Sequence, residues 1–183
     1  QGLRDAIAAG KKILVLINPP YAEATSGDTI SGGENKAGVA KTKFASTAMT
    51  VYGKASNELF MQFLVRIAHE LPIATVAIFS KLKYITAPTL DQFRAQWKAN
   101  FLSGFVVHSK SFDGLSGDFP IGFLIWATNQ TGRKNMPITE IEVEVLDKAA
   151  KPIGMKIFSN ISEVSLLTDW TVRPEGNEID ALP

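Results

Sequence analysis

The chain has 183 residues, of which 45% are hydrophobic and 20% charged, values ordinary for one globular domain with a sizeable core. Its 19 basic and 18 acidic residues leave a net charge of +1, so the charge of the whole chain does not indicate nucleic-acid binding. The absence of cysteine excludes disulfides, thiolate metal sites and cysteine nucleophiles, and suits a cytoplasmic location. No apolar run approaches the roughly 18 to 20 residues of a membrane helix, and no pattern typical of a signal peptide opens the sequence.

The first elements are a short helix and a buried strand. Residues 3–10 predict a helix that ends at Gly10, and "ILVLI", residues 13–17, is apolar at every position. Such a run predicts a central parallel strand covered on both faces, and Pro19 and Pro20 end it because neither can donate to a strand ladder. Residues 22–54 are rich in Gly, Ser, Thr, Ala and Lys and predict a long loop of the kind that is usually functional or mobile.

Strands and helices then alternate along the chain. The predicted elements are a helix over 56–71 capped by Ser56 or Asn57, a strand over 73–80, a helix over 89–101, and strands over 104–109 and 119–128. This alternation favours an α/β fold with a parallel sheet, and the short link before the strand over 119–128 favours an antiparallel hairpin. The alternating segment 138–147 predicts a half-exposed strand that forms a second hairpin with 151–159, followed by a loose tail.

A stiff polar tip follows the first strand. Asn18 precedes a proline and is pushed towards an extended backbone, and both prolines have φ near −65°. The side-chain oxygen of Asn18 and the carbonyl of Pro19 therefore present two acceptors at the carboxyl end of a strand, where ligands bind in open α/β sheets. Tyr21 adds a flat ring beside them.

Two acceptors and a ring suit an exocyclic amine on a planar heterocycle. Accepting both N–H hydrogens favours a more pyramidal nitrogen, whose lone pair can attack an electrophilic methyl group. Removing a base from a duplex costs a few kcal/mol, and stacking on an aromatic side chain recovers roughly 1 to 3 kcal/mol. The alternative is that Asn-Pro-Pro-Tyr forms only a tight structural turn.

The ordered motifs resemble a known family. "INPPY" resembles the catalytic motif of S-adenosylmethionine-dependent amino-methyltransferases, especially the DNA adenine-N6 methyltransferases of restriction-modification systems. "KTKFASTAMTVYGKASNELFMQFLVRI" is similar to the segment after that motif in large restriction-type enzymes, and "VAIFSKLKYI" to the next strand and turn. "GDFPIGFLIW" is similar to the family's late hairpin, in which an aromatic residue before proline packs on the flipped base. The resemblance covers roughly residues 11–128.

The resemblance implies roles for residues of this chain. Asn18 and Pro19 would bind the amine, Tyr21 would stack on the base, and Phe119 would form the second wall. Pro20 would stiffen the turn. Phosphate contacts would come from three lysines of the loop, Lys41, Lys43 and Lys54. The alternatives are an ordinary core phenylalanine at position 119 and a solvated lysine-rich loop, while His69 and His108 are expected to pack or face solvent.

One departure from the family concerns the cofactor. In DNA methyltransferases with this motif order, the strands that bind S-adenosylmethionine precede the asparagine motif, yet only 17 residues precede Asn18 and they hold no glycine-rich turn. The resemblance therefore implies a partial Rossmann-like methyltransferase sheet. Residues 1–130 would be the catalytic half without the cofactor-binding half, and 131–183 would be a hairpin extension and tail.

Several expectations follow from the missing half. The strand over 13–17 becomes an edge that seeks a partner, either the N-terminal half of the same protein or a second copy. We expect a fragment that holds the flipped adenine of double-stranded DNA and is inactive alone, its S-adenosylmethionine site being incomplete. Two other functions stay open: a methyltransferase acting on protein glutamine or RNA, and a non-catalytic interaction domain that uses the alternating strand over 138–147.

Overall fold

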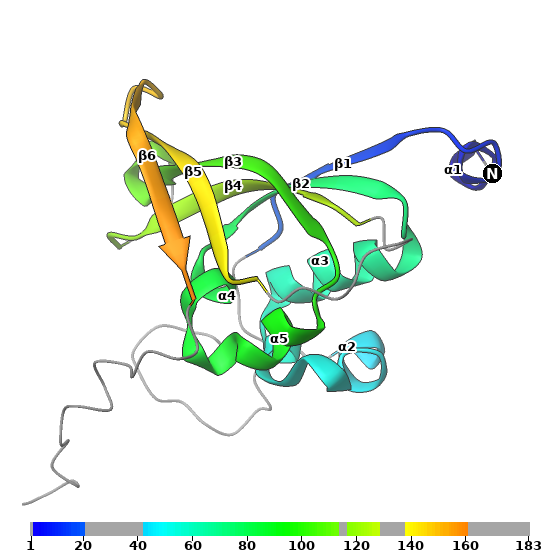
Figure 1. Cartoon of the computed structure of the whole chain (residues 1–183). Helices are drawn as coiled ribbons and strands as arrows, with labels where there is room; N and C mark the ends of the chain where they lie inside the picture. The colour runs from blue at the N-terminus through cyan, green and yellow to red at the C-terminus, as the bar shows by residue number, and fades with distance from the viewer. Residues whose placement is uncertain (1, 21–41, 114–116, 129–137, 161–183) are drawn as a thin grey trace, which may run out of the picture.

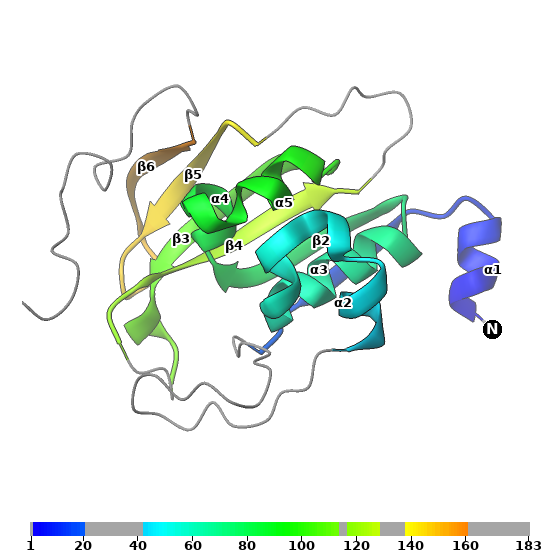
Figure 2. The same ribbon diagram turned by 90° about the horizontal axis from the view of Figure 1, so that it is seen from below.

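The protein forms a sheet with helices packed against one face (Figure 1). A computed structural model describes residues 2–20, 42–113, 117–128 and 138–160. The helices α2, α3, α4 and α5 lie below the sheet in Figure 1 and in front of it in Figure 2. None of the described helices is long and apolar enough to cross a membrane.

Six strands form one mixed sheet. Their order across the sheet is β1-β2-β4-β3-β5-β6. The bounds are β1 Ile13–Ile17, β2 Ala74–Lys81, β3 Asn100–His108, β4 Pro120–Ala127, β5 Glu140–Leu146 and β6 Pro152–Ser159. The pairs β1–β2 and β3–β5 are parallel, whereas β4 is antiparallel to both of its neighbours and β6 is antiparallel to β5. The pairs β3–β4 and β5–β6 are thus antiparallel, and β5 and β6 continue the same sheet.

The helical segments are short except for α3. The α-helices are α1 Gly2–Ala8, α2 Lys43–Thr47, α3 Leu59–Glu70, α4 Lys83–Thr86 and α5 Asp91–Gln96. Three 3-10 segments accompany them: η1 Thr50–Asn57, η2 Pro88–Leu90 and η3 Ser109–Ser111. Gly10 follows α1 with φ of +65°, a conformation that glycine adopts without strain, so the predicted stop at this residue is confirmed.

The loop predicted over 22–54 and the helix predicted over 89–101 have other structures than expected. The loop predicted over 22–54 gives way to α2 and η1 from residue 43 onward, because Thr42 caps α2 by accepting from the Ala45 N–H at 3.1 Å and the buried Ala45 and Met49 pack in the core. The helix predicted over 89–101 is confined to α5. Trp97 leaves the helix with extended backbone angles, and the chain enters β3 three residues later.

The start of α3 also differs from expectation. Neither Ser56 nor Asn57 is the N-cap; Glu58 occupies that position with an extended backbone. The Ser56 hydroxyl instead donates to the Gly53 carbonyl oxygen at 3.0 Å. Gly53 has φ of +57°, which breaks η1 into two turns, and Ser56 lies in the second of them, two residues before the N-cap.

An aromatic cluster joins the sheet to the helices. Trp126 of β4 is 1% exposed, and its ring centroid lies 5.4 Å from that of Phe101 and 6.1 Å from that of Tyr84. The indole N–H of Trp126 donates to the Tyr84 hydroxyl oxygen at 3.2 Å, which satisfies a buried donor. Each fully buried large apolar side chain contributes on the order of 1.5–3 kcal/mol relative to exposure, so this cluster holds the helical layer on the sheet.

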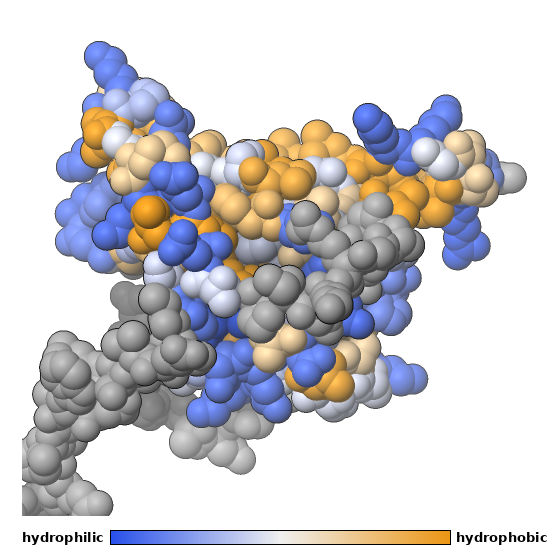
Figure 3. Space-filling model, viewed as in Figure 1, coloured by the Kyte–Doolittle hydropathy of each residue, from blue (hydrophilic) through white to orange (hydrophobic). Residues whose placement is uncertain are grey.

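The other face of the sheet is apolar and carries no described helix. Leu14 and Leu16 of β1 are 69% and 70% exposed, so the prediction that both faces of this strand are covered is wrong for the described residues. Phe79, Phe105 and Phe123 meet on the same face, with ring centroids between 4.6 and 6.2 Å apart. Figure 3 shows the apolar surface along the upper side of the molecule, over the sheet. Alternating burial in β1 follows from helices on one side only.

The close contact between β3 and β4 gives a test of this arrangement. A β-carbon at Gly104 would lie 2.5 Å from the Phe123 carbonyl oxygen and 2.8 Å from Leu124 Cδ2, so Gly104→Ala forces the two strands apart. We expect a loss of about 1–3 kcal/mol in the free energy of unfolding, measured by urea denaturation. Gly2→Ala is the control, because no described atom lies within 4 Å of its added carbon. Equal stability of the two variants would contradict the packing.

Candidate functional site

The candidate site lies at one end of the strands of the sheet, where the carboxyl ends of three strands lie side by side. Ile17, the last residue of β1, is level with Ile78 of β2, and Lys81 at the end of β2 pairs with Ile121 near the start of β4. The first residue of β4 pairs with His108, the last residue of β3. The carboxyl ends of β1, β2 and β3 and the entry to β4 therefore share one edge.

Asn18 leaves β1 at this edge. It is exposed, Pro19 behind it is buried, and Pro20 is exposed again. The two fixed φ angles hold the backbone here, and the buried ring of Pro19 anchors it to the protein. The amide of Asn18 is therefore held at the surface by a stiff support. Tyr21 and Lys41 lie outside the described residues.

Phe119 enters the same edge from the loop between β3 and β4. It precedes the first residue of β4 and is half-buried. Because Lys81 pairs with Ile121, Phe119 lies beyond the end of β2, and the Lys81 Nζ lies 5.6 Å from the centre of its ring. In the strand order, the end of β2 separates Phe119 from the end of β1. Phe119 is thus a half-buried residue outside the fully buried core, with a cation beside its ring.

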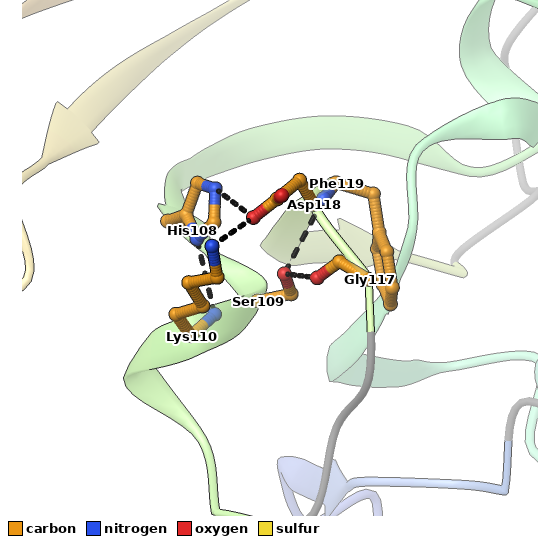
Figure 4. A network of polar contacts seen from close by, with 6 residues as sticks. All are labelled: His108, Ser109, Lys110, Gly117, Asp118 and Phe119. Carbon is orange, nitrogen blue, oxygen red and sulfur yellow. Dashed lines mark hydrogen bonds and ion pairs between the residues drawn. The ribbon is translucent and has the colours of Figure 1, made fainter.

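A group of polar side chains holds the loop before Phe119 (Figure 4). Ser109 is fully buried, and its hydroxyl donates to the Gly117 carbonyl oxygen at 2.7 Å. Asp118 lies between Lys110 and His108, with its carboxylate 2.6 Å from the Lys110 Nζ and 3.5 Å from the His108 Nε2. Sequence reasoning did not identify Ser109, Gly117 or Asp118. The available signal was the run of Ser, Gly and Asp between two apolar strands, which marks a structured turn.

The two described lysines predicted to contact phosphate lie in the helical layer. Lys43 is the first residue of α2 and Lys54 lies in η1, and both side chains are exposed. The next residue after Lys43, Phe44, stacks edge-on against His69 near the carboxyl end of α3, with ring centres 5.8 Å apart. Among the described contacts, neither lysine forms an ion pair or reaches the ends of β1 and β2. Their role with phosphate stays a prediction.

The ionisable groups near the end of β2 mainly stabilise the fold. Lys83 of α4 pairs with Glu58, whose side chain is 8% exposed, and this pair ties the start of α3 to the segment after β2. Burial raises the pKa of Tyr84 well above its ordinary value, so its hydroxyl stays protonated in the core. No three His, Asp or Glu side chains in the described segments cluster as metal ligands.

A shallow cleft lies elsewhere on the molecule. Its volume is about 230 Å³, and it is lined by Phe44, Tyr52, His69, Pro72 and their neighbours. These residues come from α2, η1, the carboxyl end of α3 and the link from α3 to the amino end of β2. The cleft is therefore separate from the edge that holds Asn18 and Phe119.

No protein-family model matches the sequence, and no curated protein matches it. Solved structures do show similarity to it, and three of them are the following. The first, an ATP-dependent Type ISP restriction-modification enzyme, LlaBIII, bound to DNA, has 9% identity and a TM-score of 0.45 over 74% of this chain and 10% of that chain. The second is a DrdV–DNA complex, with 14% identity and a TM-score of 0.47 over 74% of this chain and 14% of that chain.

The third is a nuclease-deletion mutant of the Type ISP restriction-modification enzyme LlaGI in complex with a DNA substrate mimic. It has 13% identity and a TM-score of 0.44 over 80% of this chain and 13% of that chain. This chain thus spans between 10% and 14% of the length of these three proteins. At this level of similarity, a functional assignment depends on the residues of the chain itself.

The buried ion pair below the site can be tested by stability. Lys83→Met leaves the Glu58 carboxylate in a mostly buried position without its ammonium partner. We expect a loss of about 1–3 kcal/mol in the free energy of unfolding, measured by urea denaturation. The control is Arg66→Met, because the Arg66–Glu70 pair has side chains 62% and 59% exposed and should contribute less than about 0.5 kcal/mol. A Lys83→Met variant as stable as the control would show that the pair does not anchor α3.

Proposed function

We propose that this chain carries the adenine-binding part of an S-adenosylmethionine-dependent DNA adenine-N6 methyltransferase of a restriction-modification system. The observation that carries the proposal is the exposed Asn18 directly after a parallel strand, supported by the buried Pro19. Phe119 enters at the same ends of the strands and is only half-buried. An amide acceptor and an aromatic surface are the two groups that a flipped amino-base requires.

The amine of the base would be held by two acceptors. The side-chain oxygen of Asn18 and the main-chain carbonyl of Pro19 accept its two N–H hydrogens in this proposal, which makes the nitrogen lone pair available. Because both prolines restrict the backbone, little reorganisation accompanies binding. Preorganised acceptors of this kind act most strongly on a nitrogen whose charge changes during reaction.

Two rings would hold the base out of the duplex. Tyr21 follows the prolines in the sequence and is assigned the first stacking surface, and Phe119 the second. Stacking on aromatic side chains is worth about 1–3 kcal/mol for a base, which is comparable to the energy needed to flip it. Lys43 and Lys54, both exposed, remain candidates for phosphate contacts, as does Lys41.

The described residues do not fit a complete cofactor site. S-adenosylmethionine would supply an electrophilic methyl group, and the family resemblance places its binding in a glycine-rich turn after a strand. Here β1 is followed by Asn-Pro-Pro, which offers one backbone N–H in three residues. In this proposal the cofactor-binding half is supplied by an N-terminal half of the same protein or by a second copy. In this proposal the cofactor-binding half docks beside β1, which within the described residues pairs with β2 alone.

The assignment predicts a specific loss of activity. In a longer form of the protein that includes the cofactor-binding half, Asn18→Ala removes the side-chain acceptor, and we expect methyl transfer to duplex DNA to fall by about 10²–10³-fold. The measurement is transfer of tritiated methyl groups from S-adenosylmethionine to duplex DNA. Asn57→Ala is the matched control, because Asn57 is exposed in η1 and should leave the rate unchanged.

Other outcomes separate the remaining functions. Transfer to RNA or to a protein glutamine, with none to duplex DNA, would replace DNA as the substrate. Full activity of Asn18→Ala would leave the motif as a structural turn and favour an interaction domain. The 183-residue chain itself should show no tight binding of S-adenosylmethionine in calorimetry. Robust methylation by this chain alone would overturn the assignment of the cofactor site to another segment.

A further inference from the structure

The loop between β3 and β4 is tied down at the point where Phe119 leaves it. We propose that Ser109 is a positioning residue that sets the direction of the Phe119 ring at the candidate site. This inference rests on the proposed function for its purpose, although its geometry stands on hydrogen bonds of the described residues. Figure 4 shows the six residues concerned.

Ser109 makes three hydrogen bonds to the two ends of the Gly117–Phe119 segment. Its hydroxyl donates to the Gly117 carbonyl oxygen at 2.7 Å and accepts from the Phe119 N–H at 3.3 Å. Its own N–H donates to the Phe119 carbonyl oxygen at 2.9 Å. Both backbone polar groups of Phe119 are therefore bonded to one buried serine, which restricts the φ and ψ of Phe119 and with them the direction of its side chain.

Asp118 lies between Gly117 and Phe119 and is held by contacts on the solvent side of the loop. The Asp118 carboxylate accepts from the Lys110 Nζ at 2.6 Å and lies 3.5 Å from the His108 Nε2, while the His108 Nδ1 accepts from the Lys110 N–H at 3.1 Å. Asp118 is 67% exposed, so these contacts are individually weak. Their effect is to hold the outer side of the loop, whereas the buried Ser109 holds the inner side.

Gly117 brings the loop close to the ring. Its φ is +96°, a conformation that disfavours residues with a side chain, and a β-carbon there would touch Phe119 Cδ1 and Cε1 at 3.5 Å. The Lys81 Nζ lies 5.6 Å from the centre of the same ring. The ring therefore has the Gly117 backbone and a lysine as neighbours, and Phe119 as a residue is only half-buried.

Such an arrangement is suited to binding more than to packing. A core phenylalanine is held by apolar neighbours and needs no dedicated hydrogen bonds. Here Phe119 is only half-buried, yet a fully buried serine bonds both of its backbone polar groups. A ring ordered before the base arrives lowers the entropic penalty of stacking, which is how preorganisation raises affinity.

The test follows the ring and the ligand separately, in the whole 183-residue chain. The ligand probe is 2′-deoxyadenosine 5′-monophosphate, titrated by NMR, and the ring probe is carbon-13 relaxation of Phe119 in phenylalanine-labelled protein. The variants are Ser109→Ala and Ser109→Cys, which both remove the hydroxyl; the second retains the volume and stays informative if the first fails to fold. Ser111→Ala, at an exposed serine of the same turn, is the matched control.

We expect both Ser109 variants to increase the motion of the Phe119 ring and to raise the dissociation constant about threefold to tenfold, because part of the stacking is lost. The indole N–H resonance of Trp126, a donor to Tyr84 in the core, should stay in place and show that the fold is intact. Ser111→Ala should behave as wild type. Unchanged ring motion and affinity in Ser109→Cys would overturn the inference.

Phe119→Ala separates this inference from the proposed function. We expect it to raise the dissociation constant about tenfold, since it removes the ring itself. If Phe119→Ala weakens binding and the Ser109 variants do not, the role of Ser109 is wrong while the base site stands. If Phe119→Ala binds the nucleotide as well as wild type, the wall role of Phe119 in the proposed function is wrong, and ring relaxation in the Ser109 variants alone decides whether Ser109 orders the ring.

Discussion

The antiparallel strand β4, placed between β2 and β3, is the constraint on which the rest of the structure depends. Because β4 runs opposite to both neighbours, its entry lies at the edge where β1, β2 and β3 end. That placement brings Phe119 to the edge that holds Asn18, although about a hundred residues separate them in the sequence. The same strand carries Trp126 into the core, so the element that delivers the ring to the site also anchors the helical layer.

Helices cover only one face of the described sheet. Helices pack on the face that carries Trp126, and the opposite face of the described sheet presents leucine and phenylalanine side chains. Among the described strands β1 is an edge strand, and its Leu14 and Leu16 are largely exposed. Unpaired strand edges and large apolar surfaces are both unfavourable in an isolated domain. Both features accord with the proposal that a further segment docks beside β1.

The candidate site combines two kinds of stiffness. At Asn18 the rigidity is covalent, since two consecutive prolines fix the backbone that follows the strand. At Phe119 it comes from hydrogen bonds, because a buried serine bonds both backbone polar groups of that residue. The rigidity at Asn18 can be recognised in the sequence, because the two prolines are adjacent. The rigidity at Phe119 depends on Ser109 and Phe119 meeting across a loop, and a serine in a polar turn has no distinguishing sequence signal.

The sequence by itself determined the order of the strands, including the strand over 13–17, and the polar residues at the end of that strand, because these depend on local periodicity and on the fixed geometry of proline. It could not determine where α5 ends, since Trp97 leaves the helix in favour of aromatic packing with residues distant in the chain. It also could not show that one face of β1 is open, or that Ser109 holds Phe119. Burial and loop hydrogen bonds are decided by partners brought together only in the tertiary structure, and for that reason only the fold revealed them.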